Sequence, residues 1–419
     1  MENTTQDKTS QALYTERNQR FMDAIAMKTP DRVPIFAVET YFPARYAGIT
    51  KKDAHYDHPA WYGAWKKYLA DFEPDMNSLL ISRINSVQAD EALGYHQQKY
   101  PGYGLDDNRA FQFVEGEYMK AEEYDHFLDD PTDFLLRVYL PRTHKSMEAL
   151  GMLPPLKLLM MGAANLAPIT LAPPFVTMFQ AINQAAQEAA NRAMHEAEFY
   201  NWASEQGFPK FCDGLSLAPY DWISDFLRGM RGTMLDMRRC PEKLIAAQEK
   251  LLPLSINSAI GAAQASGNPR IFIPLHRGAD GFMSVKQFEE FYWPFLKQMI
   301  LALVDAGLAP MPFFEGRYDQ RLEYLRELPA GKVLCWFDRT DMKQAKEVLG
   351  DKLCIAGGMP VSILETGTVD QVKTLTKQLI DIAGKDGGYI MTANTVLDEA
   401  DPVLVKAWMD TTKEYGVYS

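Results

Sequence analysis

The chain has 419 residues, of which 47% are hydrophobic and 23% charged, with a formal net charge of −12. Its length allows a large core, in one α/β barrel or in two to three smaller domains. The acidic balance excludes a basic nucleic-acid-binding stripe. The four cysteines lack CxxC or framework spacing, and residues 1–19 are too polar for a secretory signal. We therefore expect a cytoplasmic protein with reduced thiols.

The N-terminal part of the chain begins with a predicted disordered tail, residues 1–13, ahead of a domain that spans 14–419. A helix is expected over 15–28, where apolar residues recur at helical spacing and a Thr-Pro pair follows. The next predicted elements are a strand at 33–38, a helix at 59–72 and a strand at 76–81.

Residues 95–205, approximately, depart from this alternation and are interpreted as an insertion, either a lid or a partner-docking surface. The insertion contains an acidic run and an Ala-rich helix expected at 179–206. Its most apolar stretch, 152–179, is interrupted by Lys157 and several prolines, so no membrane span is expected.

From residue 241 onward, predicted helices and short apolar strands alternate regularly. This pattern is typical of parallel strands joined by helical crossovers. Counting both halves gives about eight strands, which predicts a (β/α)8 TIM barrel. The strands are expected at 270–275, 309–314, 332–337, 353–356 and 388–392, and the helices at 241–266, 285–305, 319–327, 341–348, 369–384 and 402–415.

Several predicted strands end in polar side chains. The carboxyl ends of the strands meet at one end of a barrel, where such residues form a shared site. The sequence therefore predicts a site at the barrel mouth. The strand-end residues are Glu39, the pair His276-Arg277, the pair Glu315 and Arg317, the pair Asp338-Arg339, and Asn394.

Motifs along the chain resemble those of the uroporphyrinogen decarboxylase superfamily. The resemblance covers most of the chain outside the insertion and implies a (β/α)8 barrel. The motifs are Arg20-Phe21 with Thr29-Pro30-Asp31-Arg32-Val33-Pro34, Pro74-Asp75 with Glu91-Ala92-Leu93-Gly94, Ser284 with Phe288-Glu289-Glu290-Phe291 and Pro294, Gly357-Gly358 with Thr366-Gly367-Thr368, Gly387-Gly388-Tyr389-Ile390, and Pro402 with Val405, Met409 and Tyr415-Gly416.

The decarboxylase branch of that superfamily has an RQAGR-type segment that clamps substrate carboxylates, and an aspartate after the second strand. Here the first region, 39–46, contains only Arg45, and the second, 80–85, contains no aspartate. Because a polycarboxylate tetrapyrrole needs several positive charges, porphyrinogen decarboxylation is not expected.

The other branch consists of corrinoid-dependent methyltransferases. Its coenzyme-M-directed members hold zinc through a His-x-Cys-Gly motif and a later cysteine. The matching positions here are Phe313-Phe314-Glu315-Gly316 and the region of Asn394, so all three ligands differ. The acidic segment 112–125 resembles instead methyltransferases that pass methyl groups from methoxylated aromatics to a corrinoid protein. That resemblance implies a corrinoid (cobalamin) carried by a partner protein, and zinc is a further candidate cofactor.

Cleaving an aryl methyl ether releases a phenolate, which needs an acid or a Lewis acid to leave. The catalytic candidates are Glu315, His276 and Asp338, of which His276 and Glu315 are also the candidate metal ligands. An aromatic slot and arginines for a ring carboxylate are expected beside them. The substrate-binding candidates are Glu39, Tyr41, Arg277, Phe313, Phe314, Arg317, Trp336, Arg339 and Asn394.

Structural roles compete with each of these assignments. His276 can be a core histidine, Glu315 an ion-pair partner of Arg317, and Asp338 a rim partner of Arg339, while Glu39, Asn394 and Asp221 can cap turns or helices.

The function has alternatives as well. One is a lyase acting on a small carboxylated compound, favoured by the arginines. Another is a non-catalytic tetrapyrrole-binding barrel, favoured by the missing zinc ligands. The expected partners are a corrinoid protein and a small methylated substrate, with a homodimer as an alternative to a monomer, and with neither nucleic acid nor membrane.

Overall fold

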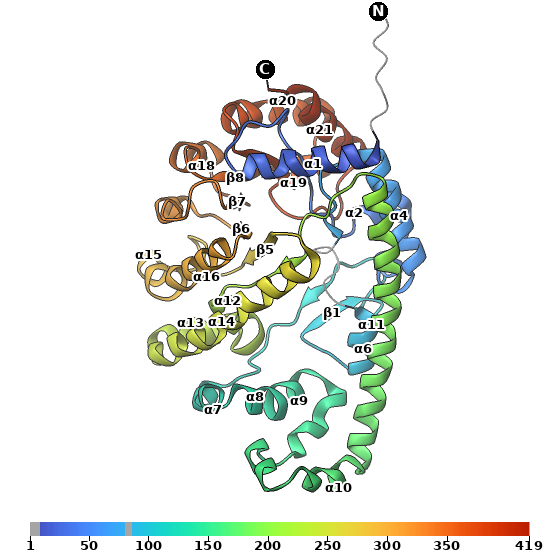
Figure 1. The fold of residues 1–419 in the computed structure, drawn as a ribbon, viewed down its shortest axis with the longest axis vertical. Helices are drawn as coiled ribbons and strands as arrows, with labels where there is room; N and C mark the ends of the chain where they lie inside the picture. The colour runs from blue at the N-terminus through green and yellow to red at the C-terminus, as the bar shows by residue number, and fades with distance from the viewer. Residues whose placement is uncertain (1–8, 80–85, 419) are drawn as a thin grey trace, which may run out of the picture.

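The computed structural model describes residues 9–79 and 86–418. Its centre is a parallel sheet in which each strand pairs with the next along the chain (Figure 1). The strands are β4 (Gly214–Leu215), β5 (Arg270–Leu275), β6 (Ala309–Phe314), β7 (Leu334–Phe337), β8 (Cys354–Met359) and β9 (Tyr389–Ala393). The bounds of β5 and β6 are those predicted from the sequence.

Two irregular segments continue the sheet from β9 back to β4. Residues 33–39 lie beside β9, where the Phe36 amide donates to the Met391 carbonyl at 3.2 Å. The Asp75 amide donates to the Ile35 carbonyl at 2.8 Å, and the Asn77 amide to the Pro209 carbonyl at 2.8 Å. These bonds give eight strand positions in a ring, so the predicted (β/α)8 barrel is confirmed.

The helices that follow the strands begin and end where the sequence signals place them. Helix α14 starts at a proline, whose missing N–H costs nothing in the first turn, and ends at Gly267 with φ +74°. Helix α20 begins with a capping box between Thr368 and Gln371. The helices of this half are α12 (Pro219–Trp222), α13 (Gly229–Arg239), α14 (Pro241–Ser266), α15 (Val285–Gln287), α16 (Trp293–Asp305), α17 (Leu322–Leu325), α18 (Met342–Leu349), α19 (Val361–Thr366), α20 (Val369–Leu379) and α21 (Pro402–Tyr415).

Helix α1 covers the amino-terminal end of the barrel. It spans Ser10–Ile25, so the prediction of a disordered tail up to residue 13 is wrong for residues 10–13, and residues 1–8 lie outside the described part. Phe21 and Ile25 of this helix are buried in the same cluster as Phe36 and Phe272. The helix therefore closes the floor of the barrel interior.

Side chains alternate along the strands between this interior cluster and an outer cluster under the helices. Phe313 and Trp336 belong to the interior cluster. Phe314 and Phe337 belong to the outer cluster, and their rings stack at 5.2 Å. Because neighbouring residues of a strand face opposite sides, residues 276, 315 and 338, which follow the strands, emerge on the interior side.

The insertion emerges after the second strand position and returns at β4. In Figure 1 it lies beyond the sheet, and α11 (Pro173–Glu205) runs along the molecule and connects the two. Helix α11 starts earlier than predicted, at a Pro-Pro pair. The predicted strand 76–81 enters residues 80–85, which lie outside the described residues. Within residues 9–79 and 86–418, no helix is long and apolar enough to cross a membrane.

The remaining α-helices and strands precede β4. The helices are α2 (Phe42–Ala47), α3 (Asp53–Tyr56), α4 (His58–Phe72), α6 (Val87–Leu93), α7 (Tyr124–Asp129), α8 (Pro131–Phe134), α9 (Leu140–Thr143) and α10 (Ala167–Thr170). The strands of the insertion are β1 (Gln98–Pro101), β2 (Gly104–Leu105) and β3 (Gln112–Phe113). The 3-10 and π-helical turns are η1 (Ala121–Glu123), η2 (Leu135–Tyr139), η3 (Lys145–Met152), η4 (Leu156–Met161), η5 (Ala163–Leu166), η6 (Ile223–Leu227), η7 (Phe288–Tyr292), η8 (Asp319–Arg321) and η9 (Ile380–Gly384).

Candidate active site

His276 follows β5 at the barrel mouth and is held by Asp225. Its Nδ1 lies 2.5 Å from Oδ2 of Asp225, and its Nε2 lies 3.7 Å from Oε1 of Glu315. Arg277 binds the other oxygen of Asp225 at 2.9 Å and the Ser224 hydroxyl at 2.9 Å. The second imidazole nitrogen is thus directed at Glu315 but lies too far from it for a hydrogen bond.

Two carboxylates that hold this group come from the loop after β4. Asp221 lies on α12 and accepts the backbone amides of His276 and Arg277 at 3.1 and 3.2 Å and the Tyr292 hydroxyl at 2.7 Å. Asp225 lies on the π-helical turn η6 that continues α12. Single π-helical turns often occur at functional sites. Both aspartates fix the orientation of the residues after β5.

Burial and charge act in opposite directions on His276, whose side chain remains 27% exposed. Burial alone lowers its pKa, but the hydrogen bond to Asp225 and the negative charges of Glu315, Asp225 and Asp221 outweigh burial and raise the pKa to about 9. His276 is therefore mainly an imidazolium at neutral pH. Burial also raises the pKa of Asp221, against the opposing charge of His276.

Glu315 and Asp338 lie on neighbouring strand ends. Desolvation raises the pKa of Glu315, the charge of His276 opposes that rise, and the charges of Asp338 and Asp225 add to it. Its side chain is nevertheless 41% exposed, so part of the carboxyl reaches solvent. Burial also raises the pKa of Asp338, although the Gly316 amide and the Asn394 side chain donate to its carboxylate at 2.9 and 3.0 Å.

These contacts bring five predicted residues together at one end of the barrel: His276, Arg277, Glu315, Asp338 and Asn394. The side-chain oxygen of Asn394 also accepts a hydrogen bond from the Val361 backbone amide at 2.9 Å. The Asn394 side chain therefore bridges the residues that follow β7 and β8. The competing structural role for Glu315, an ion pair with Arg317, is not found among the described residues, because Arg317 faces Asp319 at 3.5 Å while Glu315 faces His276.

An aromatic floor lies below the mouth. Phe313 and Trp336 stack with ring centroids 3.9 Å apart, and the Trp336 indole N–H donates to the Ala393 carbonyl at 3.0 Å. Both rings are buried, so they support the mouth from beneath. The prediction that Phe314 lines the same slot is wrong, because the alternation of the strand turns it outward against Phe337 and Tyr318.

The other predicted substrate-binding residues are exposed at the rim of the mouth or buried in its wall. Arg317 and Arg339 are exposed, and Arg339 approaches Asp338 only at 3.8 Å, as a rim ion pair. Glu39 is fully buried and accepts hydrogen bonds from Tyr68 of α4 and from Ser78. The Tyr41 hydroxyl contacts a His55 ring nitrogen at 2.7 Å. Their described contacts place Glu39 and Tyr41 in the barrel wall and its neighbouring loops.

The metal assignment of His276 and Glu315 has little support in their geometry. Among residues 9–79 and 86–418, no group of three or more His, Cys, Asp or Glu side chains is arranged to hold a metal ion. Catalytic zinc normally has three protein ligands. The two residues by themselves therefore do not fit a zinc site.

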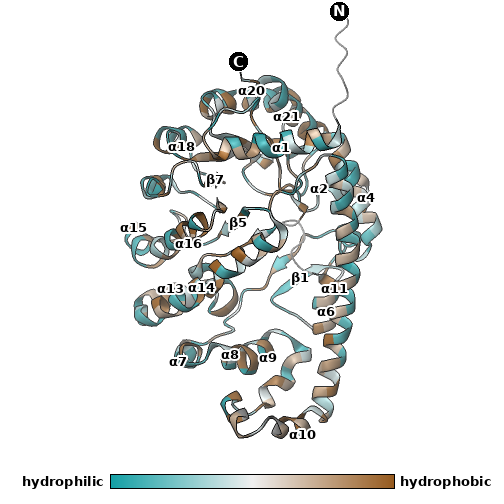
Figure 2. Ribbon diagram, in the orientation of Figure 1, coloured by the Kyte–Doolittle hydropathy of each residue, from teal (hydrophilic) through white to brown (hydrophobic). Residues whose placement is uncertain are grey.

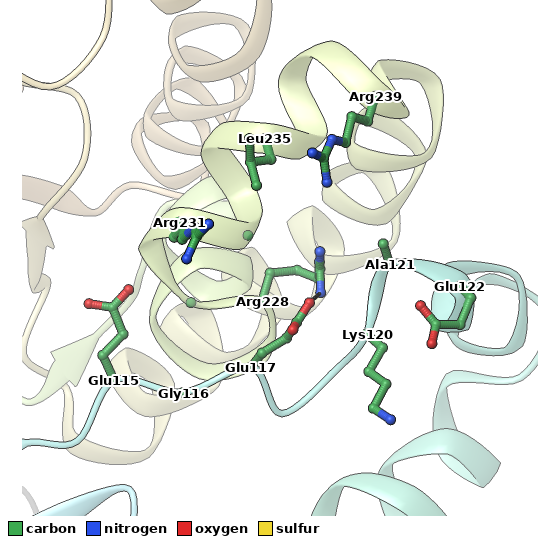
Figure 3. Close-up of a pocket in the computed structure, with 12 residues that line it drawn as sticks. Glu115, Gly116, Glu117, Lys120, Ala121, Glu122, Arg228, Arg231, Leu235 and Arg239 are labelled. Atoms are coloured by element: carbon green, nitrogen blue, oxygen red, sulfur yellow. Dashed lines mark hydrogen bonds and ion pairs between the residues drawn. The ribbon is translucent and has the colours of Figure 1, made fainter.

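A cavity of about 570 Å³ lies elsewhere, between the insertion and α13 (Figure 3). Its lining mixes carboxylates of residues 115–122 with arginines on or beside α13. Arg228 is buried there and paired with Asp236 at 2.6 Å and with Glu117. These bonds tie the insertion to the barrel, and none of the predicted strand-end residues lines the cavity.

Sequence reasoning missed Asp225 as a functional residue, and saw Asp221 only as a helix cap. A signal was present, because the two aspartates are four positions apart in a segment entering a helix and therefore share one face. Tyr292, whose hydroxyl donates to Asp221, was also missed. Its position depends on tertiary packing of η7, which no local pattern reveals.

Comparison with known proteins agrees with this architecture. Residues 212–415 match the family model described as Uroporphyrinogen decarboxylase (URO-D). The predicted resemblance to that superfamily is thus confirmed for this part of the chain, which is just under half of it. No curated protein sequence matches the chain.

Among solved structures, one described as "methyltransferase from Methanosarcina mazei" superimposes with a TM-score of 0.62 at 15% sequence identity. The match covers 95% of this chain and 98% of the other. Residues from both halves of this chain, including the insertion, therefore have structural counterparts in that protein.

Proposed function

We propose that this protein is a methyltransferase that moves a methyl group from a methoxylated aromatic compound to the Co(I) corrinoid of a partner protein. Three findings support the proposal: the URO-D domain, the fold shared with a protein described as a methyltransferase, and the acid–carboxylate cluster at the barrel mouth. The cluster is the observation that carries it.

The chemistry required is protonation of a poor leaving group. The bond between methyl carbon and ether oxygen breaks, the carbon accepts an electron pair from Co(I), and the oxygen retains the bonding pair and takes a proton. His276 is suited to donate that proton, because its pKa of about 9 approaches that of a phenol, about 10. The phenol then leaves neutral.

The neighbours of His276 have defined tasks in this proposal. Asp225 holds Nδ1, so the proton on Nε2 is the one presented to the substrate. The carboxylate of Glu315, 3.7 Å from Nε2, stabilises the imidazolium by its charge. Asp338 and Asn394, which follow β7 and β9 and are hydrogen-bonded to each other, are the remaining contacts for a substrate polar group.

The lyase alternative requires arginines directed at a substrate carboxylate. Arg277 is already bound to Asp225 and Ser224, Arg45 pairs with Glu399 at 2.8 Å, and Arg317 and Arg339 are exposed at the rim. Each of these four arginines already has a carboxylate partner. Binding of a substrate carboxylate by arginines, which the lyase alternative needs, therefore has less support than proton donation by His276.

Methyl transfer tests the proposal directly. Purified protein is mixed with reduced Co(I) corrinoid and a panel of methoxylated aromatics, and methyl-Co(III) is followed by its visible spectrum while released phenol and bound metal are measured. Formation of methyl-cobalt with an equal amount of phenol is expected. No transfer from any donor, with methanol and methylamines included, would reject the proposal.

A further inference from the structure

Another cavity, of about 410 Å³, lies at the amino-terminal end of the barrel, the end opposite to the mouth. It is lined by residues of α1, of the end of α11 and of the start of β5. In Figure 2 hydrophilic residues, coloured teal, are prominent along α1. None of the residues assigned to the mouth lines this cavity, so a ligand held in it is separate from the candidate active site.

The side chain of Arg270, which begins β5, lines the cavity and is only 3% exposed. Its guanidinium donates to the Phe211 carbonyl at 2.7 Å, the Lys210 carbonyl at 2.6 Å and the side-chain oxygen of Asn18 at 2.7 Å. All of these acceptors are neutral. Among residues 9–79 and 86–418, no carboxylate lies within ion-pair distance of Arg270. The charge of Arg270 is therefore not balanced by a direct contact.

Three other buried arginines of the chain each have an opposite charge beside them. They are Arg20 beside Asp75, Arg228 beside Asp236 and Arg321 beside Asp280. A buried charge is costly unless it is paired. Burial lowers the pKa of Arg270 to about 10, and the charge of Asp213 does not offset that effect. An anion in the cavity would supply the missing opposite charge.

The other charged groups of the lining balance one another. The Nζ of Lys210 lies 2.8 Å from Oδ1 of Asp213 and 3.8 Å from the centre of the Tyr200 ring. The second oxygen of Asp213 accepts a hydrogen bond from the Asn268 side chain at 2.9 Å. The lining thus has one carboxylate against two cations, and the surplus is a single positive charge, that of Arg270.

We infer that this cavity binds a small organic molecule with one carboxylate group, which contacts Arg270. The hydrogen bonds of the guanidinium leave further N–H donors for a carboxylate. A single negative charge balances the surplus, whereas a doubly charged phosphate exceeds it. The Phe208 ring and the side chains of Asn201 and Ser204 are contacts for the apolar and polar parts of the molecule. The volume is within the range of small-molecule sites, about 300–1,000 Å³.

Such a ligand joins three parts of the fold. Asn18 belongs to α1, Asn201 and Ser204 to the last turns of α11, and Arg270 to β5. A ligand that binds only the folded chain raises its stability by mass action. Carboxylate binding is therefore expected to stabilise the attachment of α11, which leads from the insertion, to the barrel. The inference does not depend on the proposed reaction.

Thermal unfolding of the full chain in sodium acetate or sodium benzoate, compared with sodium chloride at equal ionic strength, tests the inference. The carboxylates are expected to raise the melting temperature as their concentration increases, beyond any effect of chloride. Asn201→Asp adds a second carboxylate at the exposed rim of the cavity, so it should weaken carboxylate binding at least about tenfold. Asn191→Asp is the matched control, since Asn191 is also exposed on α11 but lies about 15 Å along the helix from Asn201.

Arg270→Gln removes the charge but keeps a hydrogen-bond donor, and it should abolish the stabilisation by carboxylates. Circular dichroism confirms that each variant is folded, and Asn201→Asp, at an exposed position, decides the test where Arg270→Gln does not fold.

Three results would overturn the inference. They are carboxylates that stabilise no more than chloride, equal stabilisation of the Asn201→Asp and Asn191→Asp chains, and stabilisation by inorganic phosphate but not by carboxylates. The second result would mean that the carboxylates bind elsewhere, the mouth included. Methyl transfer is not a readout of this experiment.

Discussion

The two ends of the barrel each hold a cluster of charged side chains, but the clusters differ in charge balance. At the amino-terminal end, Asp75 is fully buried and binds Arg20 at 2.6 Å, Arg32 at 2.7 Å and the Ile35 amide at 2.8 Å. Burial opposes ionisation of Asp75, but the two guanidinium groups outweigh it and lower its pKa. Arg20 also binds Asp31 at 2.6 Å.

At the carboxyl end the carboxyl groups outnumber the cations. Glu315, Asp221 and Asp338 all have raised pKa values, because burial outweighs the positive charge available to each of them. A network in which each charge has an opposite partner stabilises the fold. Carboxyl groups with raised pKa values are instead candidates for acid–base chemistry. This difference assigns stability to the amino-terminal end and reactivity to the mouth, as is usual in barrels of this class.

The test with the largest expected effect removes His276, the proposed acid at the barrel mouth. His276→Gln is expected to lower the rate of methyl transfer about 10²- to 10⁴-fold, since glutamine keeps a polar side chain but donates no acidic proton. Stopped-flow formation of methyl-cobalt measures the loss per folded molecule. Denaturant unfolding is measured in parallel, because the variant also loses the contacts of the imidazolium with Asp225 and Glu315.

His96→Gln is the control, because His96 is exposed in the insertion and distant from the mouth in sequence and contacts. Equal losses of the methyl-transfer rate in both variants would mean that His276 takes no part in the reaction.

The opposite test is made at the amino-terminal end. Asp75→Ala leaves Arg20 and Arg32 with uncompensated charge, and is expected to reduce the free energy of unfolding by about 3–5 kcal/mol. The methyl-transfer rate per folded molecule should stay the same. Asp129→Ala, which removes an exposed ion pair with Lys157, is the control and should leave stability unchanged.

A stable Asp75→Ala protein with impaired transfer would reverse the roles assigned to the two ends.

Asp225→Asn tests positioning within the mouth. The asparagine retains the shape but removes the charge that helps to raise the pKa of His276, so that pKa should fall and the rate should decline about tenfold at neutral pH. In the natural chain the acid form of His276 is lost as pH rises through about 9. In the variant the decline should begin at lower pH.

The pH–rate profile separates this effect from a structural one. A general weakening of the fold lowers the rate at every pH, whereas a positioning and charge effect moves the alkaline limb of the profile. An unmoved limb would show that Asp225 does not set the protonation of His276.

The amino-terminal cluster also gives a structural role to some of the motifs that resemble the superfamily. Arg20, Asp31, Arg32 and Asp75 are all part of the motifs that resemble the superfamily, and all serve the fold. The strand bounds were predictable because apolar runs between turn signals fix them locally. Neither the motifs nor the strand bounds reveal the reaction, because the reaction depends on the side chains at the barrel mouth.

At the mouth, the sequence placed His276, Glu315, Asp338 and Asn394 correctly because each directly follows a strand. It failed where the outcome depends on side-chain alternation or on non-local packing. Phe314 is one residue from Phe313 yet faces outward, and Glu39 is turned into the wall against Tyr68. Asp225 reaches His276 only because η6 folds over β5.

The last test has the smallest expected effect and concerns Glu39. Glu39 is a buried acid that lies outside the two charged clusters. Burial raises its pKa to about 8, although Ser78 and Tyr68 donate to it. The folded chain therefore holds a proton that the unfolded chain, with a pKa near 4.5, releases. Its contribution to the unfolding free energy is complete below pH 4.5 and declines as pH rises to about 8.

Glu39→Gln removes this titration and should change the stability little at pH 5, where Glu39 is already neutral. The variant should become more stable than the natural chain as pH approaches 8. His276 adds a decline of the same sign between about pH 6.5 and 9, but it does so in both proteins. The difference between their unfolding free energies, measured by denaturant at each pH, therefore isolates Glu39. A difference that is constant with pH would mean that Glu39 is ionised in the fold and that its burial is compensated by a cation yet to be found.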